Sequence, residues 1–433
     1  MGIVRFVHHI QFACKNIWNT YELLSRGFGY HLFCVSNHGP HLNVVLRNGK
    51  SVLMLSEVGG RAFKDASNPY VYAITNRLMS RDRPFDIALE VADVNEICDR
   101  VKRVDGPNGV LLEPVTHSDY HGKVTMAVVQ SCLGGLLHTV IDSSHYTGRF
   151  MPGYISPEFG LSPTLKRRLQ EKPIVYCKSV PSILGVDHVA LACNTNESSA
   201  TVQWYGDIFV VASLDDDING FVLKYGDTGM RLKAVDYDPN KSDVSEEEIS
   251  CKFVIVEPLD KSTPNQVTRF LKVNNGPGIQ HIGLSINDIF DAVRVCRAGG
   301  AQFLDPPRAY YDELLKLAST KQTHLDLELL RGSGVLLDTE VLDHNHSRNP
   351  HEDAFLSSCT YLLQIFTAPL FDKDGFFMEL IERHAGASGF GAGNITALWR
   401  AVESARLEPN STTDCAVISD SNKETRSLRY SRA

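Results

Sequence analysis

The sequence predicts an α+β fold of two similar domains, each formed by a pair of β-α-β-β-β modules. A short alternating strand, with His at its second or third position in three of the four copies, recurs four times within the 433 residues. Each copy precedes a helix-like stretch, a turn and further strands. A cluster of Pro and Gly residues between the second and third copies separates the modules into two pairs.

The strands that open the modules have the pattern of half-buried strands. Alternation of apolar and polar residues over five or six positions is typical of a strand with one buried face. We expect these strands at 7–12, 85–89, 186–191 and 280–284, and helices after the second and fourth of them at 94–101 and 289–293.

The chain is expected to divide into an N-terminal domain at 1–150, a linker at 151–184, a C-terminal domain at 185–407 and a disordered tail at 408–433. The acidic stretch 236–250 and the polar stretch 338–360 are expected to be surface insertions.

Composition narrows the classes of partner. The net charge is −8, the pI is near 6.1 and Lys and Arg are scattered, which argues against a nucleic-acid partner or an anionic membrane surface. No apolar run approaches the roughly eighteen residues of a transmembrane helix. A small-molecule ligand is therefore the expected partner.

The cysteines and the N-terminus bear on the location of the chain. The ten cysteines form no CxxC pair, which favours free thiols in a reducing compartment. The N-terminus has neither a secretory signal nor a clear transit peptide.

Three residues of the C-terminal half form a candidate metal site. A lone His in a strand is usually a core or surface residue, but His188 and His281 occupy the same place in two successive modules. Their side chains should therefore face the same side of a shared sheet. Glu379 interrupts an apolar strand, where an unpaired carboxylate is costly. Two His and one carboxylate are the ligands of the facial triad, which leaves three positions open on Fe(II).

The N-terminal half supplies an internal comparison for this site. His9 matches the first histidine, but Asp86 stands in the place of the second and Thr139 in the place of the glutamate. Only the C-terminal half is therefore expected to hold a metal ion.

Several segments, in order along the chain, resemble the 4-hydroxyphenylpyruvate dioxygenase family. They are GPGIQHI at 276–282, PP at 306–307 with YY at 310–311, LLQIFT at 362–367, and FME at 377–379 running through RH at 383–384 to GFGAGN at 389–394. The resemblance covers nearly all of 180–405 and the N-terminal half more weakly. It implies a vicinal-oxygen-chelate fold of two domains, each an open curved sheet or half-barrel, with a C-terminal helix that closes the active site.

The resemblance also implies a site and a reaction. The triad would hold one Fe(II) per subunit, where an aromatic 2-oxo acid and O₂ would react by oxidative decarboxylation. The amides and aromatic rings that surround substrate in the family fall at Gln266, Gln280, Gln364, Phe366 and Phe390, with Asn394 before the closing helix at 395–404. Neutral amides orient a phenol or carboxylate without adding charge, although a strand Gln is more often polar surface and a Phe more often core.

One segment departs from the family pattern. The family's Pro-Ile-Asn-Glu-Pro reads VIVEP at 254–258, so Val256 replaces a substrate-facing Asn, and 218–222 lacks the hydroxyl of a substrate-facing Ser. The apolar Val256 resembles the residue that the hydroxymandelate synthases carry at this place. These enzymes hydroxylate the benzylic carbon of the substrate instead of its ring. The pattern is closest to an animal dioxygenase-like branch of the family. This branch implies formation of 4-hydroxymandelate for the ubiquinone head group in mitochondria.

Several alternatives stay open at this point. The product could instead be homogentisate in tyrosine catabolism, or the chain could be a catalytically silent relative that acts as a binding protein. A cytoplasmic location and a homodimer are also open. The His, Asp and Glu residues of the loop at 343–353 have metal-binding side chains, but a solvated surface loop is the favoured interpretation.

Overall fold

The computed structural model describes residues 4–36, 42–57, 81–157, 167, 180–210, 212–213, 221–225, 228–236, 252–260, 265–315, 325–339, 360–387, 389, 391 and 393–395. Several sequence predictions fall outside these residues: the tail at 408–433, nearly all of the stretches 236–250 and 338–360, the loop at 343–353, the stretch 218–220, Phe390, and the closing helix after Ile395.

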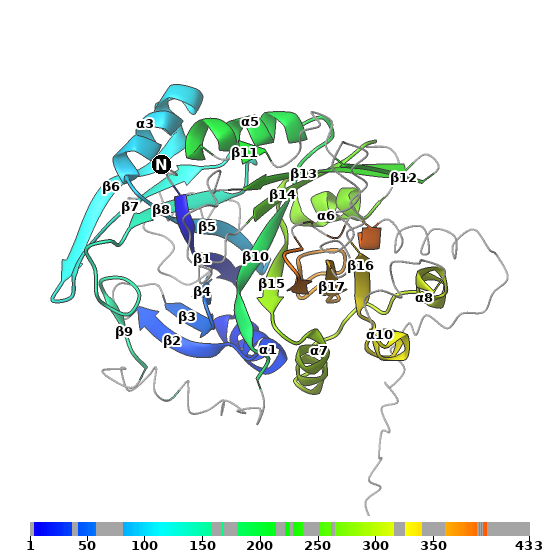
Figure 1. Ribbon diagram of the computed structural model, residues 1–433. Coiled ribbons are helices and arrows are strands. Elements are labelled where there is room, and N and C mark those ends of the chain that lie inside the picture. The colour runs from blue at the N-terminus through cyan, green and yellow to red at the C-terminus, as the bar shows by residue number, and fades with distance from the viewer. Residues whose placement is uncertain are drawn as a thin grey trace, which may run out of the picture.

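Two nine-stranded sheets form the architecture (Figure 1). The first has the order β6-β7-β8-β5-β1-β4-β3-β2-β9. Its strands are β1 (Val4–Cys14), β2 (His31–Ser36), β3 (Asn43–Asn48), β4 (Ser51–Glu57), β5 (Arg83–Val91), β6 (Val110–Asp119), β7 (Gly122–Gln130), β8 (Leu137–Asp142) and β9 (Tyr154–Ile155).

The second sheet has the order β11-β13-β14-β10-β15-β18-β17-β16, and β12 pairs with β13. Its strands are β10 (Ile183–Ala192), β11 (Ala212–Ser213), β12 (Phe221–Tyr225), β13 (Thr228–Asp236), β14 (Lys252–Pro258), β15 (Gly278–Ile286), β16 (Leu336–Thr339), β17 (Tyr361–Phe366) and β18 (Phe377–His384).

The pairing of strands confirms the predicted modules. In each module the opening strand runs parallel to the closing strand, as in β1 with β4, β5 with β8, β10 with β14 and β15 with β18. The opening strands of paired modules then meet antiparallel, β1 against β5 and β10 against β15. Each sheet is thus two β-α-β-β-β units joined along their first strands. The two curled half-barrels match the predicted fold class.

All the helices except α6 lie between the opening and the closing strand of a module, and α6 connects the third module to the fourth. They are α1 (Ile17–Phe28), α3 (Val94–Asp105), the 3₁₀ helix η2 (Pro107–Gly109), α5 (Ser198–Phe209), α6 (Gln266–Asn274), α7 (Ile289–Ala298), α8 (Arg308–Leu314) and α10 (Leu327–Ser333). The helices predicted at 94–101 and 289–293 are confirmed as α3 and α7. Each begins at an Asp whose side chain accepts a hydrogen bond from the backbone of the first turn, Asp93 and Asp288 respectively.

The two faces of each sheet have different roles because side chains alternate along a strand. On β10, Val189 and Leu191 join a large core that also contains buried residues of α1, α3, α5 and α7. That core includes residues of both sheets, and α3 lies beside α5 as α1 lies beside α7 (Figure 1). On the other face of β10, Ala190 and Ala192 belong to a separate cluster. This second face carries His188.

The division between the halves stays a prediction in its details. The last strand of the first sheet ends at Ile155, and the first strand of the second begins at Ile183. The shared core joins the two halves, so the linker limits of 151–184 are not tested by the strands alone. Among the described residues, no helix has the length and apolar character that crossing a membrane would require.

Candidate metal centre

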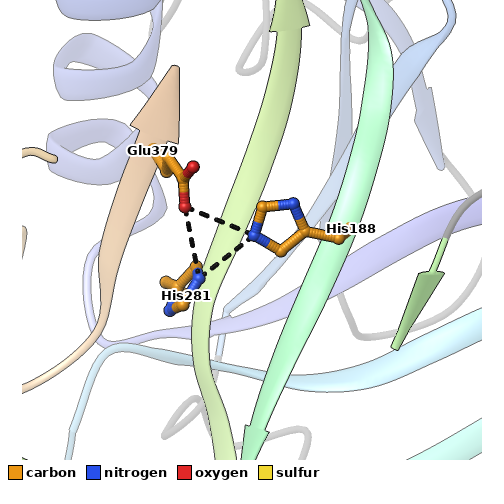
Figure 2. A group of neighbouring side chains, drawn as sticks. All are labelled: His188, His281 and Glu379. Atoms are coloured by element: carbon orange, nitrogen blue, oxygen red, sulfur yellow. Dashed lines mark hydrogen bonds and ion pairs between the residues drawn. The ribbon is translucent and has the colours of Figure 1, made fainter. Parts of the chain in front are cut away.

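Three central strands of the second sheet bring the predicted triad together (Figure 2). His188 on β10 lies opposite Gly283 on β15, and Gly283 lies opposite Glu379 on β18. His281 precedes Gly283 by two positions, so it faces the same side of the sheet. The period of a strand and the pairing of three neighbours are therefore enough to make the three side chains converge.

The distances within the triad fit a single metal ion. Nε2 of His188 lies 3.2 Å from Nε2 of His281 and 3.3 Å from Oε2 of Glu379, and the third separation, from His281 Nε2 to Glu379 Oε2, is 3.4 Å. A point about 2.1 Å from each atom, the usual length of a metal–nitrogen or metal–oxygen bond, exists for such a triangle. Among the described residues this is the one group of three or more His, Cys, Asp or Glu side chains close enough to hold a metal ion.

Asp187 fixes the tautomer of His188. The register between β10 and β15 shifts between Val186 and His188, so Asp187 is an extra residue at a β-bulge. Its Oδ1 lies 2.9 Å from Nδ1 of His188, and both oxygens accept hydrogen bonds from Arg383, at 2.7 and 2.8 Å. Because an ionised carboxylate only accepts, Nδ1 of His188 carries a proton, and Nε2 is the ring nitrogen left to bind a metal ion once it gives up its own proton.

Charge around the triad favours a cation. Burial alone would lower the pKa of His188, but Glu379 and Asp187 outweigh burial and raise it to about 9. Burial likewise opposes ionisation of Glu379, yet the two histidines lower its pKa to about 2. Burial lowers the pKa of His281, which keeps this imidazole neutral. The site therefore combines an ionised carboxylate with an imidazole nitrogen that a metal can bind without displacing a proton.

Aromatic packing orients His281. Its ring stacks on Phe377 with centroids 4.6 Å apart and meets the edge of Phe366 at 6.5 Å. Phe366 was predicted as lining, and it lies on the wall of the cavity beside the triad.

Behind Glu379 runs a chain of buried polar side chains. Gln364 donates from Nε2 to Oε1 of Glu379 at 2.8 Å, and Asn394 donates to Oε1 of Gln364 at 2.8 Å. The hydroxyl of Tyr310 donates to Asn394 at 2.8 Å and accepts from the backbone N–H of Leu337. The resemblance implied that Gln364 surrounds substrate, which stays a prediction, and the structure places its amide against the glutamate of the triad.

A cavity of about 460 Å³ opens on the triad, and four of the other predicted residues line it. Val256, Gln266, Gln280 and Phe366 all line it, while Gln364 and Asn394 do not. In a regular strand, the side chains of Gln280 and His281 would lie on opposite faces of the sheet. Gln280 faces the cavity because the register of β15 against β10 shifts between His281 and Ile279.

The sequence analysis did not predict the charged residues of the cavity wall. Arg269, Asp305 and Asp374 line it together with apolar Met230, Leu232, Val254 and Phe270. Arg269 follows Gln266 by three positions on α6, and residues three apart share a helix face. That spacing could have identified Arg269, but Asp374 lies in a connection and had no periodic signal.

The equivalent place in the first sheet is built differently. His9 lies opposite Ala88, where the second sheet has glycine, and the rings of His9 and Phe150 are 5.2 Å apart. Asp86 accepts hydrogen bonds from the backbone N–H and the hydroxyl of Thr139, and burial raises its pKa to about 6. Ala88 and Phe150 belong to an apolar cluster on this face. In the first sheet, Asp86 and Thr139, which are hydrogen-bonded to each other, thus stand in the places of His281 and Glu379.

The sequence was compared with family models and with known proteins. No family model matches the chain. The human 4-hydroxyphenylpyruvate dioxygenase-like protein is 30% identical over 392 residues, 88% of this chain and 91% of the human protein. The 4-hydroxyphenylpyruvate dioxygenase of Dictyostelium discoideum is also 30% identical, over 73% of this chain and 76% of that protein. The chain belongs to the 4-hydroxyphenylpyruvate dioxygenase family.

Solved structures agree with this family at the level of fold. A variant of 4-hydroxymandelate synthase from Streptomyces coelicolor superposes with a TM-score of 0.67 at 24% identity, covering 94% of this chain and all of that one. A fusion of a xylose isomerase-like TIM barrel with 4-hydroxyphenylpyruvate dioxygenase gives a TM-score of 0.56 at 18% identity, over 93% of this chain and 53% of the fusion.

Proposed function

We propose that this member of the dioxygenase family is a non-haem Fe(II) enzyme that oxidises an aromatic 2-oxo acid with O₂. The observation that carries the proposal is the convergence of two imidazole Nε2 atoms and one carboxylate oxygen, 3.2 to 3.4 Å apart, at the wall of a cavity. Iron held by these three residues would supply the redox chemistry that O₂ requires and would leave coordination positions for the substrate.

The chain's own residues would prepare the substrate. Gln266 and Gln280 offer neutral donors and acceptors in a cavity with otherwise largely apolar walls, so they can orient an oxygen of the substrate without competing with the metal for charge. Phe366 and Phe377 flank His281 and keep water from its ring. Asp187 holds the proton of His188 at Nδ1.

The proposed substrate is 4-hydroxyphenylpyruvate, and the proposed products are 4-hydroxymandelate and CO₂. One O₂ is consumed: one oxygen atom enters the new carboxylate and the other enters the benzylic C–H bond. Val256 supports this choice. It lies opposite Ala192 on β10, 3% exposed, and lines the cavity with Leu232 and Met230. An apolar wall there offers no hydrogen bond to hold the ring in a second orientation.

Product identification tests this assignment. The iron-loaded chain is incubated with 4-hydroxyphenylpyruvate under O₂, and the products are separated by chromatography, because 4-hydroxymandelate and homogentisate are isomers of equal mass. We expect 4-hydroxymandelate. Homogentisate would place the chain with ring-hydroxylating dioxygenases of tyrosine catabolism. Val256→Asn, which restores an amide to the wall, is the variant in which a shift towards homogentisate is expected.

A silent binding protein is the competing hypothesis. Under it, His188→Ala and Glu379→Ala change neither the iron content nor the turnover of the purified chain. The proposed enzyme instead loses both. His384→Ala is the matched control, because this histidine lies on the same strand as Glu379, stacks on Tyr361 and does not line the cavity.

We further propose a mitochondrial role in supplying the ubiquinone head group, supported by the resemblance of the sequence to the animal branch of the family. Cell fractionation tests the location, with a cytoplasmic protein as the contrary result. Loss of ubiquinone in cells that lack the chain, restored by added 4-hydroxymandelate, tests the role.

A further inference from the structure

Arg269 is the one Lys or Arg among the described residues that line the cavity. It lies on α6, one turn after Gln266, and its Nε is 3.2 Å from Oδ1 of Asp374. Asp374 belongs to the connection between β17 and β18, so the ion pair joins two separate walls of the cavity.

The pair lies at the open end of the cavity. The side chains of Arg269 and Asp374 are 35% and 36% exposed, whereas that of Glu379 is 2% exposed. Leu304 and Asp305 are exposed and line the same cavity, and Asp305 pairs with Arg297 at 3.2 Å. Between this rim and the triad, the described wall is largely apolar.

We propose that Arg269 is a specificity-determining residue that selects anionic substrates at the mouth of the cavity. The inference rests on the proposed function, which supplies an anion as substrate. An incoming carboxylate exchanges with Asp374 for the guanidinium and then passes to the triad. Exposed ion pairs contribute little stability, so such an exchange is easy. Once Asp374 has been displaced, the guanidinium at the rim of a low-dielectric cavity attracts the incoming anion.

Substituting the two partners of the ion pair is expected to change KM in opposite directions. This difference distinguishes a residue that selects the substrate from one that only holds the structure together. Arg269→Gln removes the cation, and the KM for 4-hydroxyphenylpyruvate is expected to rise about threefold to tenfold with little change in kcat. Asp374→Asn removes the competing carboxylate, and the KM is expected to fall. Asp374 has φ of 64°, a conformation that Asn tolerates well, so this substitution preserves the backbone.

A structural latch would behave differently. If the ion pair only held α6 against the β17–β18 connection, breaking it from either side would change KM in the same direction. Equal changes in both variants would overturn the proposal. Arg294→Gln is the matched control, because Arg294 forms an exposed ion pair with Asp291 on α7 and does not line the cavity. Its KM is expected to match that of the unmodified chain.

A binding experiment makes the inference independent of turnover. The Zn²⁺-loaded full chain is titrated calorimetrically with 4-hydroxyphenylacetate and with its neutral amide, 4-hydroxyphenylacetamide. Arg269→Gln is expected to weaken binding of the carboxylate about threefold or more beyond any change for the amide. An equal change for both ligands, or no carboxylate binding to the unmodified chain, would overturn the proposal. Arg269-dependent carboxylate binding in a chain that turns over no 2-oxo acid would instead defeat the proposed function alone.

Discussion

Gly283 lies between His188 and Glu379 in the sheet, and a Cβ atom added to it would lie 2.3 Å from Cε1 of His188 and 2.4 Å from its Nδ1. No side chain can occupy that position without moving the imidazole ring. The absence of a side chain at Gly283 is therefore what lets His188 lie flat across the strand towards the other two residues of the triad.

Gly283→Ala is expected to weaken metal binding without unfolding the chain. The added methyl displaces the His188 ring, and displaced or reoriented ligands typically cost about 10- to 100-fold in metal affinity. Competition with a metal-binding indicator measures the affinity. Gly332→Ala on α10 is the control, because nothing lies within 4 Å of a Cβ at that position. Unchanged affinity in Gly283→Ala would show that the ring is not confined by the neighbouring strand.

Asp187→Asn is expected to lower metal affinity by about tenfold or more. The amide can present an N–H instead of an acceptor to His188, so the imidazole loses the partner that keeps its proton at Nδ1. Arg383→Lys, which retains the positive charge but not the two-point contact with Asp187, should have a smaller effect in the same direction. Titration of the metal-free chain with Co²⁺, followed by absorbance, reports both affinity and ligand geometry. Equal affinity in all three proteins would remove Asp187 from any role in orienting the ligand.

Gln364→Leu is expected to disturb both Glu379 and the segment that carries Asn394. The substitution deprives the Glu379 carboxylate of a buried donor and the Asn394 amide of an acceptor, and a buried polar group left unsatisfied costs about 1–3 kcal/mol. Chemical denaturation measures the loss of stability, and hydrogen exchange near Asn394 measures the local loosening. If exchange increases only far from Asn394, the polar chain does not tie this segment to the triad.

His138 gives a pH dependence of stability. It is fully buried between the two halves, bonded to the carbonyl of Ile87 and the hydroxyl of Tyr205, and burial lowers its pKa from 6.5 to about 4. Between these values the unfolded chain binds a proton that the folded chain does not. Stability should therefore fall as pH falls from about 6.5 to about 4, by roughly 3 kcal/mol from this group.

The pH prediction is checked by comparing His138→Gln with the unmodified chain. Unfolding free energies are measured in denaturant from pH 4 to pH 7. The variant should be less stable at pH 7 but should lose less stability on acidification, because Gln does not titrate. Parallel curves for the two proteins would assign the pH dependence to other groups.

Much of the fold was predictable because its signals are local and repeated. The alternation in four opening strands and the helices that follow two of them appear directly in β1, β5, β10, β15, α3 and α7. Parallel pairing within modules and the two-sheet architecture follow from that repetition. The convergence of His188 and His281 was predictable for the same reason, since equivalent positions in paired modules face one side of a sheet.

The second layer of the site was not predictable from local pattern. Arg383 and Asp187 are 196 positions apart, and the bulge that turns Asp187 towards His188 has no signature in the alternating sequence. Gln364 fits a substrate-facing role by resemblance, but its position behind Glu379 depends on the pairing of β17 with β18. The ion pair between Arg269 and Asp374 joins a helix to a connection that carries no periodicity.

The sequence by itself thus determined the modules, the fold class and the three residues of the candidate metal site, because strand period and internal repetition fix which side chains share a face. Tertiary structure alone decided how these residues are held. Gly283 and Gln364 act through contacts across strands, and Asp187 reaches His188 through a β-bulge while Arg383 of another strand holds its carboxylate. Contacts of these kinds depend on register and bulges rather than on the alternation of residues within one strand.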